Sequence, residues 1–274
     1  MRIVFCIDDN PRYLMLVKVA VRSLRALYGN DVPVLCVYGG ADEGIINAVW
    51  EEGIPLALHE PVLSRQVVPP QFHRAIGAFL KLELALLPEL ANEEYVLYCD
   101  SDMYFHSRFD ALLTERPPYM AMAREASAIF FHDIETMRYE WRDREYVVRM
   151  PFPIWTFSSG VVMFNLGRLR RHDHIHNFLA FCAQNLHHIG NLDQSLLNYF
   201  FGSRVTKLPF PFNCPPYRAE SRGQGSLIHF HGPKPWDVST PLWRELRINH
   251  YSWFRQQWYS LLTPEEREQV RTWE

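Results

Sequence analysis

The sequence predicts an α/β fold in which a mostly parallel central sheet carries helices on both faces. Three observations support this. Short apolar runs rich in branched residues recur at 2–7, 32–38 and 55–58. Segments with helical spacing, 13–28 and 42–52, lie between these runs. This alternation requires crossover connections, which are right-handed and place helices on both sides of a parallel sheet.

The same patterns extend the fold along the chain. We predict helices over 75–87, 166–187, 193–201 and 241–262, and strands over 95–99, 119–123, 154–165 and 227–231. Asp193 suits the N-cap of the third of these helices. Residues 125–149 show weak periodicity, which we interpret as an insertion or a mobile loop. We therefore expect a sheet domain over 1–238 and a C-terminal helical appendage over 239–274, with a capping box that begins at Thr263.

Composition excludes several classes of protein. The 274 residues are 48% hydrophobic, which is too much apolar material for a disordered chain. The 28 Lys+Arg against 31 Asp+Glu give a net charge of -3, which argues against a nucleic-acid partner. The longest uncharged stretch, 150–167, contains prolines and glycines and is a poor membrane span. The five cysteines form no C-x-x-C pair, which is typical of core residues in a reducing compartment. The N-terminal apolar run is too short for a signal peptide, so we expect a cytoplasmic location.

The motif Asp100-Ser101-Asp102 directly follows an apolar strand. Ligands of open α/β sheets bind at the carboxyl ends of the strands. Two carboxylates spaced by one residue in a turn there can converge on one hard cation such as Mg²⁺ or Mn²⁺. Taken alone, the motif is equally typical of a polar turn that ends a strand.

A second motif spans 228–236 and reads Ile-His-Phe-His-Gly-Pro-Lys-Pro-Trp. An imidazole beside two carboxylates would favour Mn²⁺, since imidazole suits transition metals better than Mg²⁺. Lys234 could then meet a phosphate as a point charge. The alternative is a strand and turn with buried histidines.

Two further segments favour a site more weakly. The small residues Ser158, Ser159 and Gly160 in a strand allow another group to approach the backbone, or mark a bulge. Asp193 and Gln194 at a helix start could face a cleft, or only cap the helix. By contrast, the histidines at 172, 174 and 176 do not share one helical face, and we interpret them as a solvated surface.

Together and in this order, these motifs resemble those of glycosyltransferase family 8. That family has a GT-A fold, uses Mn²⁺ and a nucleotide-sugar, and retains the anomeric configuration. The sequence is most similar to bacterial lipooligosaccharide galactosyl- and glucosyltransferases, over about residues 1–236. The resemblance is carried by Asp8-Asp9-Asn10, Leu80-Lys81-Leu82, Asp100-Ser101-Asp102, Ser159-Gly160-Val161, Asp193-Gln194, His229, Gly232 and Lys234-Pro235-Trp236.

The resemblance implies a role for each matched position. The metal ligands would be Asp100, Asp102 and His229, and the catalytic, sugar-binding neighbourhood would be Asp193 and Gln194. The donor would contact Cys6, Asp8 and Asn10 at its uracil and ribose, Gly232 and Lys234 at its diphosphate, and also Lys81, Ser101, Ser159 and Gly160. The implied partners are a UDP-hexose, galactose or glucose, and a glycan or lipid-linked acceptor, with Mn²⁺ or Mg²⁺ as the ion.

The chain departs from the family pattern in three places. Gly232 and Lys234 are two residues apart where the family has three, which leaves His231 as a rival metal ligand. Ser158 stands where an Asn is common. Phe79 stands where close relatives carry an Arg that holds the donor, and Arg74, about one helical turn earlier, is the candidate to replace it.

The implied chemistry is physically consistent. Cleavage of the sugar–phosphate bond develops charge on the diphosphate, which Mn²⁺ and Lys234 would neutralise. Retention requires either a protein nucleophile, for which Asp193 is the candidate, or a same-face attack in which the leaving phosphate accepts the proton. We favour the second. An alternative function is a weakly active or inactive nucleotide-sugar-binding protein of the same fold.

The C-terminal segment from Trp243 to Leu262 is rich in Trp, Tyr, Phe and Arg. Such residues favour the headgroup region of a membrane, and lipid-linked acceptors would lie there. The same aromatics could equally pack the appendage onto the domain. The aromatics do not share one face, because Tyr251, Phe254 and Trp258 fit a helical stripe while Trp253 and Tyr259 fall off it. The segment as a whole is thus a candidate for peripheral contact with the inner face of the membrane.

Overall fold

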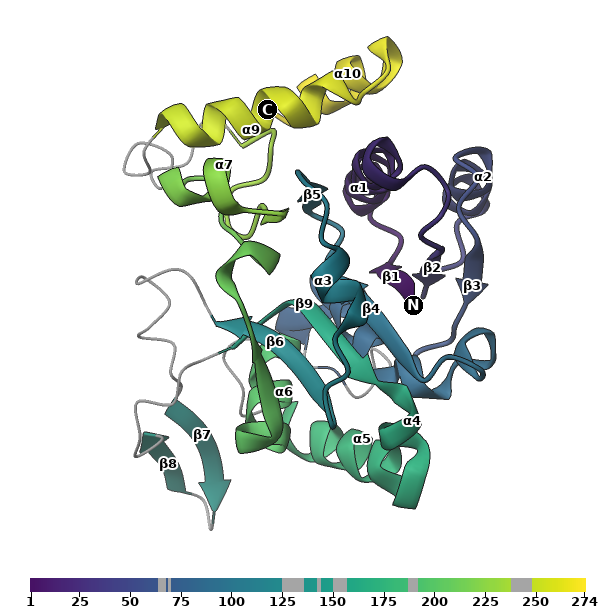
Figure 1. Cartoon of the computed structure of the whole chain (residues 1–274). Helices are drawn as coiled ribbons and strands as arrows, with labels where there is room; N and C mark the ends of the chain where they lie inside the picture. The colour runs from purple at the N-terminus through teal and green to yellow at the C-terminus, as the bar shows by residue number, and fades with distance from the viewer. Residues whose placement is uncertain are drawn as a thin grey trace.

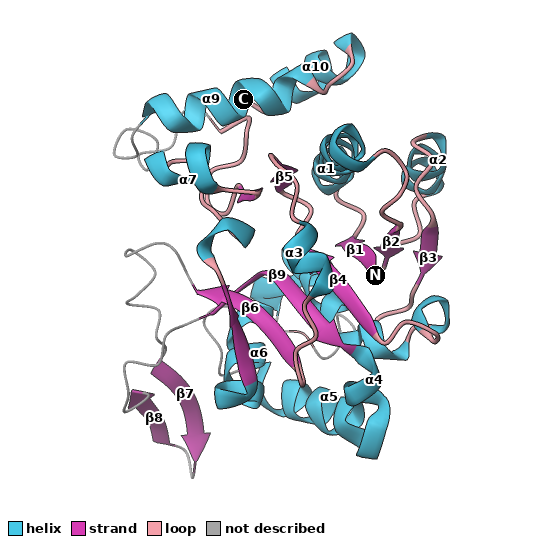
Figure 2. Cartoon of the chain, viewed as in Figure 1, coloured by secondary structure: helices cyan, strands magenta, loops and turns pink. Residues whose placement is uncertain are grey.

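A seven-stranded sheet flanked by helices forms the centre of the structure, a computed structural model (Figure 1, Figure 2). The structure describes residues 1–63, 68, 70–124, 136–141, 144–149, 157–186, 192–237 and 248–274. In order across the sheet, the strands are β10 (Val205–Leu208), β6 (Met120–Arg124), β9 (Phe157–Asn165), β4 (Tyr95–Cys99), β1 (Arg2–Ile7), β2 (Val34–Tyr38) and β3 (Leu56–Leu58).

Only β9 runs against the other strands of this sheet. It pairs antiparallel with β4 and β6, whereas the pairs β1–β2, β1–β4, β2–β3 and β6–β10 are parallel. The predicted α/β class with a mostly parallel sheet is therefore confirmed. Because β1 and β4 are adjacent and parallel, the loops after both strands meet at one edge.

Helices cover both faces of the sheet. The described α-helices are α1 (Pro11–Tyr28), α2 (Glu43–Glu51), α3 (Asp110–Thr114), α4 (Leu166–Arg170), α5 (His174–Asn185), α6 (Leu192–Phe201), α7 (Ala219–Gln224), α9 (Ile248–Ser260) and α10 (Pro264–Arg271). The 3-10 helices are η1 (Pro70–Leu86), η2 (Pro88–Leu90), η4 (Arg171–Asp173), η6 (Gly202–Arg204) and η7 (Phe210–Phe212).

The alternation of side chains along each strand builds two cores. In β1, Ile3, Phe5 and Ile7 pack on the side of α1 and α2. Val4 and Cys6 point the other way, toward η1, α5 and α6. Both sets are buried because successive side chains of a strand face opposite sides of a sheet. A continuous apolar run such as 2–7 is what a strand covered on both faces requires.

Three segments differ in detail from the sequence-based expectation. The predicted helix over 75–87 belongs to the longer 3-10 helix η1. The predicted helix over 166–187 is broken into α4, η4 and α5, because His172 and Asp173 adopt left-handed φ values of 53° and 56°. The predicted insertion at 125–149 contains an antiparallel hairpin of β7 (Thr136–Trp141) and β8 (Arg144–Arg149), and 125–135 lies outside the described residues.

A second, two-stranded sheet reaches the edge where the site forms. Strand β5 (Met103–Phe105) follows Asp102 directly and pairs antiparallel with β11 (Leu227–His229). The register places His229 opposite Met103. Residues more than a hundred positions apart in the sequence are thereby brought next to each other.

The C-terminal helices α9 and α10 pack onto α1, above β5 and α7 (Figure 1). Tyr251, Phe254 and Trp258 are fully buried, in a cluster with Leu16 and Val19 of α1. This aromatic stripe is therefore part of the core, because its rings cover apolar side chains of α1. Trp243 lies outside the described residues.

Ion pairs close the same contact. Arg22 of α1 binds Glu52, at the end of α2, with two hydrogen bonds of 2.7 Å, and binds Glu266 of α10 at 2.5 and 3.0 Å. Glu266 also completes the predicted capping box with Thr263. These bonds lower the pKa of Glu266 to about 2, against the opposing effect of burial.

Candidate active site

A cavity of about 240 Å³ opens where β1 and β4 end. Its lining contains seven of the residues that the sequence analysis selected: Cys6, Lys81, Asp100, Ser101, Asp102, Asp193 and Lys234. Tyr13, Gly77, Ala78 and Tyr98 complete it. Its place at the carboxyl edge of the sheet is where open α/β sheets bind ligands.

Asp100, Asp102 and His229 converge at this cavity. One ligand atom from each lies within 4.8 Å of the others. Nε2 of His229 is 3.1 Å from Oδ1 of Asp102 and 3.5 Å from Oδ2 of Asp100. The pairing of β5 with β11 produces this arrangement, and it is reinforced by a hydrogen bond from the Phe230 amide to the Asp102 carbonyl (3.0 Å).

The orientation of the His229 ring is set from behind by Asn213. The two side chains are buried, and Nδ1 of His229 lies 3.0 Å from Oδ1 of Asn213. If the amide oxygen accepts, the proton sits on Nδ1 and Nε2 keeps a lone pair that faces the two carboxylates. A partner that fixes the remote nitrogen is the usual arrangement of a histidine that binds a metal.

Gly160 makes room for the same ring. A Cβ atom on Gly160 would overlap the His229 ring, and the Gly160 carbonyl accepts the Asp100 amide at 2.8 Å. The small residues of this strand predicted that another group approaches the backbone closely, and that group is the His229 ring. Any side chain at this position would push His229 away from the carboxylates.

Asp102 is buried between the Lys234 ammonium group and the His229 ring. Lys234 Nζ donates to Oδ2 at 2.5 Å. Oδ1 is buried and accepts no hydrogen bond from the described residues. Burial alone would raise the pKa of Asp102, but Lys234 and His229 lower it well below its ordinary value. The carboxylate therefore stays ionised, with one oxygen directed at the space that Asp100 and His229 share.

Lys81 links the two acidic parts of the site. Its ammonium group is buried and lies 2.8 Å from both Asp100 Oδ1 and Asp193 Oδ2. It also donates to the Ser159 carbonyl at 3.3 Å, and Tyr98 donates to Asp100 at 2.5 Å. Burial alone would lower the pKa of Lys81, but the two aspartates raise it, so the lysine is a permanent cation.

Asp193 is in the first turn of α6, which begins at Leu192, and is not its N-cap. Its carboxylate points at Lys81 and into the cavity. Burial raises the pKa of Asp193, and the Lys81 charge opposes that rise. Gln194 uses its side-chain oxygen to accept the Ser159 amide at 3.2 Å. Both residues are therefore tied to the floor of the site.

The three N-terminal positions differ in their contacts. Cys6 lines the cavity. The Asp8 carboxylate accepts the backbone amides of Asn10 and Gly77, each at 3.1 Å, and is buried. Asn10 accepts the Arg12 amide and caps α1. Among the described contacts, its side chain thus organises the β1–α1 turn.

His231, the rival metal ligand, faces elsewhere. Its Nε2 lies 3.3 Å from the hydroxyl of Tyr217, and burial lowers its pKa to about 3. The group that converges on the cavity contains His229. Gly232 next to it has φ 85°, a left-handed conformation that favours glycine, and so turns the chain toward Lys234. Phe79 is a core residue, fully buried.

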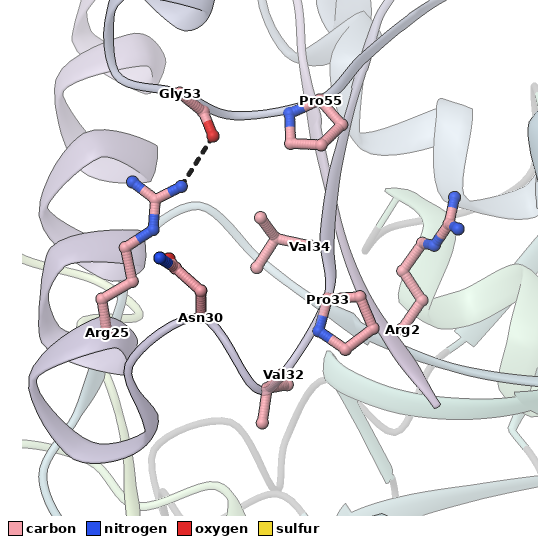
Figure 3. A pocket seen from close by; sticks show the side chains of 8 residues that line it. All are labelled: Arg2, Arg25, Asn30, Val32, Pro33, Val34, Gly53 and Pro55. Carbon is pink, nitrogen blue, oxygen red and sulfur yellow. Dashed lines mark hydrogen bonds between the residues drawn. The ribbon is translucent and has the colours of Figure 1, made fainter.

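A larger hollow, of about 660 Å³, lies near the amino ends of β1 and β2 (Figure 3). Arg25 there donates to the carbonyls of Glu52 and Gly53, both at 2.7 Å. These bonds join α1 to the α2–β3 turn. In the described part of the chain, the one metal-type cluster is that of Asp100, Asp102 and His229, so the smaller cavity is the candidate active site.

Three contributors escaped the sequence analysis. Asn213 lies in a proline-rich stretch without a pattern, and its role exists only through its contact with His229. Gly77 acts through its backbone amide, and a side-chain pattern gives no sign of that contact. Tyr98 lies in the predicted strand 95–99, and its side chain belongs both to the core and to the lining of the cavity.

Comparison with known proteins identifies the family of the chain. The sequence profile "Glycosyl transferase family 8" matches residues 73–240. The chain therefore belongs to glycosyl transferase family 8, and it is a glycosyltransferase. Over 100 residues it is 35% identical to the "Probable glycosyl transferase Gly" of Streptococcus gordonii. The aligned segment covers 33% of this chain and only 14% of that protein's length.

Solved structures share the fold. The galactosyltransferase LgtC, crystallised in complex with donor and acceptor sugar analogs, aligns with a TM-score of 0.72 over 98% of this chain and 100% of its own, at 20% identity. The glycosyltransferase GlyE of Streptococcus pneumoniae aligns with a TM-score of 0.60 over 94% of this chain and 63% of its own, at 16% identity. The GT-A fold is thus confirmed. Among the described helices, none has the length and apolar character to cross a bilayer.

Proposed function

We propose that this enzyme transfers a hexose, galactose or glucose, from a UDP-sugar to a glycan or lipid-linked acceptor, with Mn²⁺ and with retention of the anomeric configuration. One observation carries the proposal. Two carboxylates and an oriented imidazole converge beside Lys234, at a cavity on the carboxyl edge of the sheet. Family membership supplies the reaction class.

The residues present fit a divalent cation. Among the described residues, none donates a hydrogen bond to the buried Asp102 Oδ1, and Nε2 of His229 is held toward it. Two oxygens and one nitrogen suit Mn²⁺ better than Mg²⁺, which prefers oxygen alone. Asp100, Asp102 and His229 would hold the ion, which would supply positive charge to the leaving diphosphate.

The other residues of the chain bind and orient the reactants. Lys234 Nζ lies at the cavity and would release Asp102 to contact a diphosphate oxygen, as a point charge. Lys81 keeps the Asp193 carboxylate fixed at the floor. Asp193 and Gln194 would face the sugar, and the acceptor hydroxyl would attack from the side of the leaving phosphate, which takes its proton.

The donor base would sit at the end of β1. Cys6 lines the cavity there, and Asp8 lies two residues further along the chain. A carboxylate can accept the single N–H of uracil, and a backbone amide can serve one of its carbonyls. We expect UDP to bind at least about tenfold more tightly than ADP, a difference of about 1.4 kcal/mol. Equal affinities, measured by calorimetry, would contradict this placement.

A turnover assay tests the reaction. UDP-galactose and UDP-glucose are incubated with the metal-stripped enzyme, with and without MnCl₂, and UDP release is followed together with glycoside formation. Mn²⁺-dependent UDP release coupled to transfer supports the proposal. UDP binding without turnover of either donor across an acceptor screen would instead identify a nucleotide-sugar-binding protein.

For its location, we propose the cytoplasm, where the acceptor would be a growing glycan at the inner face of the membrane. Trp253 and Tyr259 of α9 pack at the edge of the cluster with α1 and are only partly buried, so their exposed parts are the candidates for membrane contact. Co-sedimentation with anionic vesicles, comparing the full chain with Trp253→Ala and Tyr259→Ala, tests this. Equal, negligible binding of all three would place the enzyme in solution.

A further inference from the structure

We propose that Tyr251, on the C-terminal helix α9, is a positioning residue for the donor diphosphate, because its hydroxyl holds the loop that carries Lys234. The inference rests on the proposed role of Lys234. The Tyr251 hydroxyl lies 2.9 Å from the Pro233 carbonyl and 2.7 Å from the Lys234 carbonyl. Arg255, one turn later, donates Nε to the Pro235 carbonyl at 2.6 Å.

The sequence of the loop explains why it needs outside donors. Pro233 and Pro235 have no N–H group, so the loop cannot be held by hydrogen bonds that these residues donate. Gly232 precedes Pro233, adopts a left-handed conformation and, having no Cβ atom, leaves the backbone there free to move. The Lys234 amide donates to Asp237 at 2.7 Å, within the same loop. The Lys234 carbonyl also accepts the Asp237 amide at 2.8 Å. The donors of the Pro233 and Pro235 carbonyls, by contrast, come from α9.

Tyr251 is well suited to fix this loop. Its side chain is fully buried, and its ring packs edge-on against Phe230 with centroids 5.6 Å apart. Phe230 directly follows His229. At the other end of the loop, Lys234 Nζ donates to Asp102 Oδ2 and to the Phe230 carbonyl. A shift of the loop backbone would move the ammonium group relative to Asp102.

The experiment compares ligands with and without a diphosphate. Tyr251→Phe keeps the ring and removes the hydroxyl. We expect it to raise the Kd of UDP about three- to tenfold in calorimetry with MnCl₂, the effect of one lost hydrogen bond, while the Kd of uridine is unchanged. Arg255→Gln should act in the same direction, and it decides the matter if Tyr251→Phe does not fold.

Two controls separate positioning from stability. Tyr28→Phe removes another buried hydroxyl, which accepts the Phe109 amide at 2.6 Å far from the cavity. It should lower Tm and leave the Kd of UDP unchanged. In a Lys234→Ala background, Tyr251→Phe should weaken UDP less than about twofold, because coupled residues are not additive.

The outcomes are distinct. If Lys234→Ala alone leaves the Kd of UDP unchanged, the proposed diphosphate role of Lys234 is wrong and this inference falls with it. If Lys234→Ala weakens UDP but neither Tyr251→Phe nor Arg255→Gln does, the inference is wrong and the proposed function stands. Tyr251 would have only a structural role if Tyr251→Phe weakened the binding of UDP and uridine equally. The same would follow if it weakened UDP binding as strongly in the Lys234→Ala background as in the unmodified enzyme.

Discussion

The hydrogen bond between Asn213 and His229 offers the sharpest test of the proposed metal site. Asn213→Ala leaves Nδ1–H of a buried ring without an acceptor, which costs about 1–3 kcal/mol. The ring can avoid that cost by moving its proton to Nε2, where Asp102 Oδ1 lies 3.1 Å away. The proton would then occupy the position that a metal needs.

The expected loss of Mn²⁺ affinity is about 10- to 100-fold, the usual effect of removing the partner of a metal-binding histidine. This corresponds to about 1.4–2.8 kcal/mol. Calorimetric titration of Mn²⁺ in the presence of UDP measures it, and UDP release at increasing MnCl₂ gives a second readout. Asn213→Asp, which keeps the acceptor oxygen, should restore most of the affinity.

Asn165→Ala is the matched control. Asn165 is also buried, donates to the Pro117 carbonyl and caps α4, but it lies at the far end of β9. It should lower Tm without changing the Kd of Mn²⁺. Our reasoning would be refuted if Asn213→Ala bound Mn²⁺ as tightly as the unmodified enzyme, because the ring would then need no partner.

Three other substitutions test the site and the tail. Asp102→Ala should abolish Mn²⁺-dependent UDP release while circular dichroism shows an intact fold; full activity with chelator present would contradict the site. Gly160→Ala should reduce turnover at least about 100-fold and destabilise the fold by about 1–3 kcal/mol, since its methyl group overlaps His229; unchanged kinetics would disprove this packing. For Glu266→Gln, urea unfolding near pH 6 should show a free energy of unfolding about 1–2 kcal/mol lower than that of the unmodified protein, allowing for solvent screening. Because folding lowers the pKa of Glu266 to about 2, this deficit should shrink as pH falls from about 4.5 toward 2; a deficit independent of pH would show that the Glu266 charge is not responsible.

Local pattern was sufficient to predict most of the sheet. Strands such as β1 and β4 are continuous apolar runs that end at polar turns, and that signal lies within one segment. The pair Asp100 and Asp102 was predictable for the same reason. The assignment of His229 came instead from the family resemblance, and the structure supports it through the contact of Nδ1 with Asn213.

What the sequence could not predict depends on contacts between distant segments. Nothing around Asn213 distinguishes it from an ordinary loop residue. The aromatic stripe of α9 fitted a membrane surface as well as a core, and only the presence of α1 beneath it decides. The predicted domain boundary at 238/239 lies outside the described residues and stays a prediction.

The contact between α1 and the C-terminal helices has a consequence for how the protein is made. Leu16 and Val19 are synthesised more than 200 residues before Tyr251 and Trp258, which cover them. Until then, an apolar strip of α1 stays uncovered and open to aggregation. The loop of Lys234 likewise lacks its donors from α9. A nascent chain that has not yet reached α9 would therefore carry Asp100 and Asp102 without the hydrogen bonds that hold the Lys234 loop.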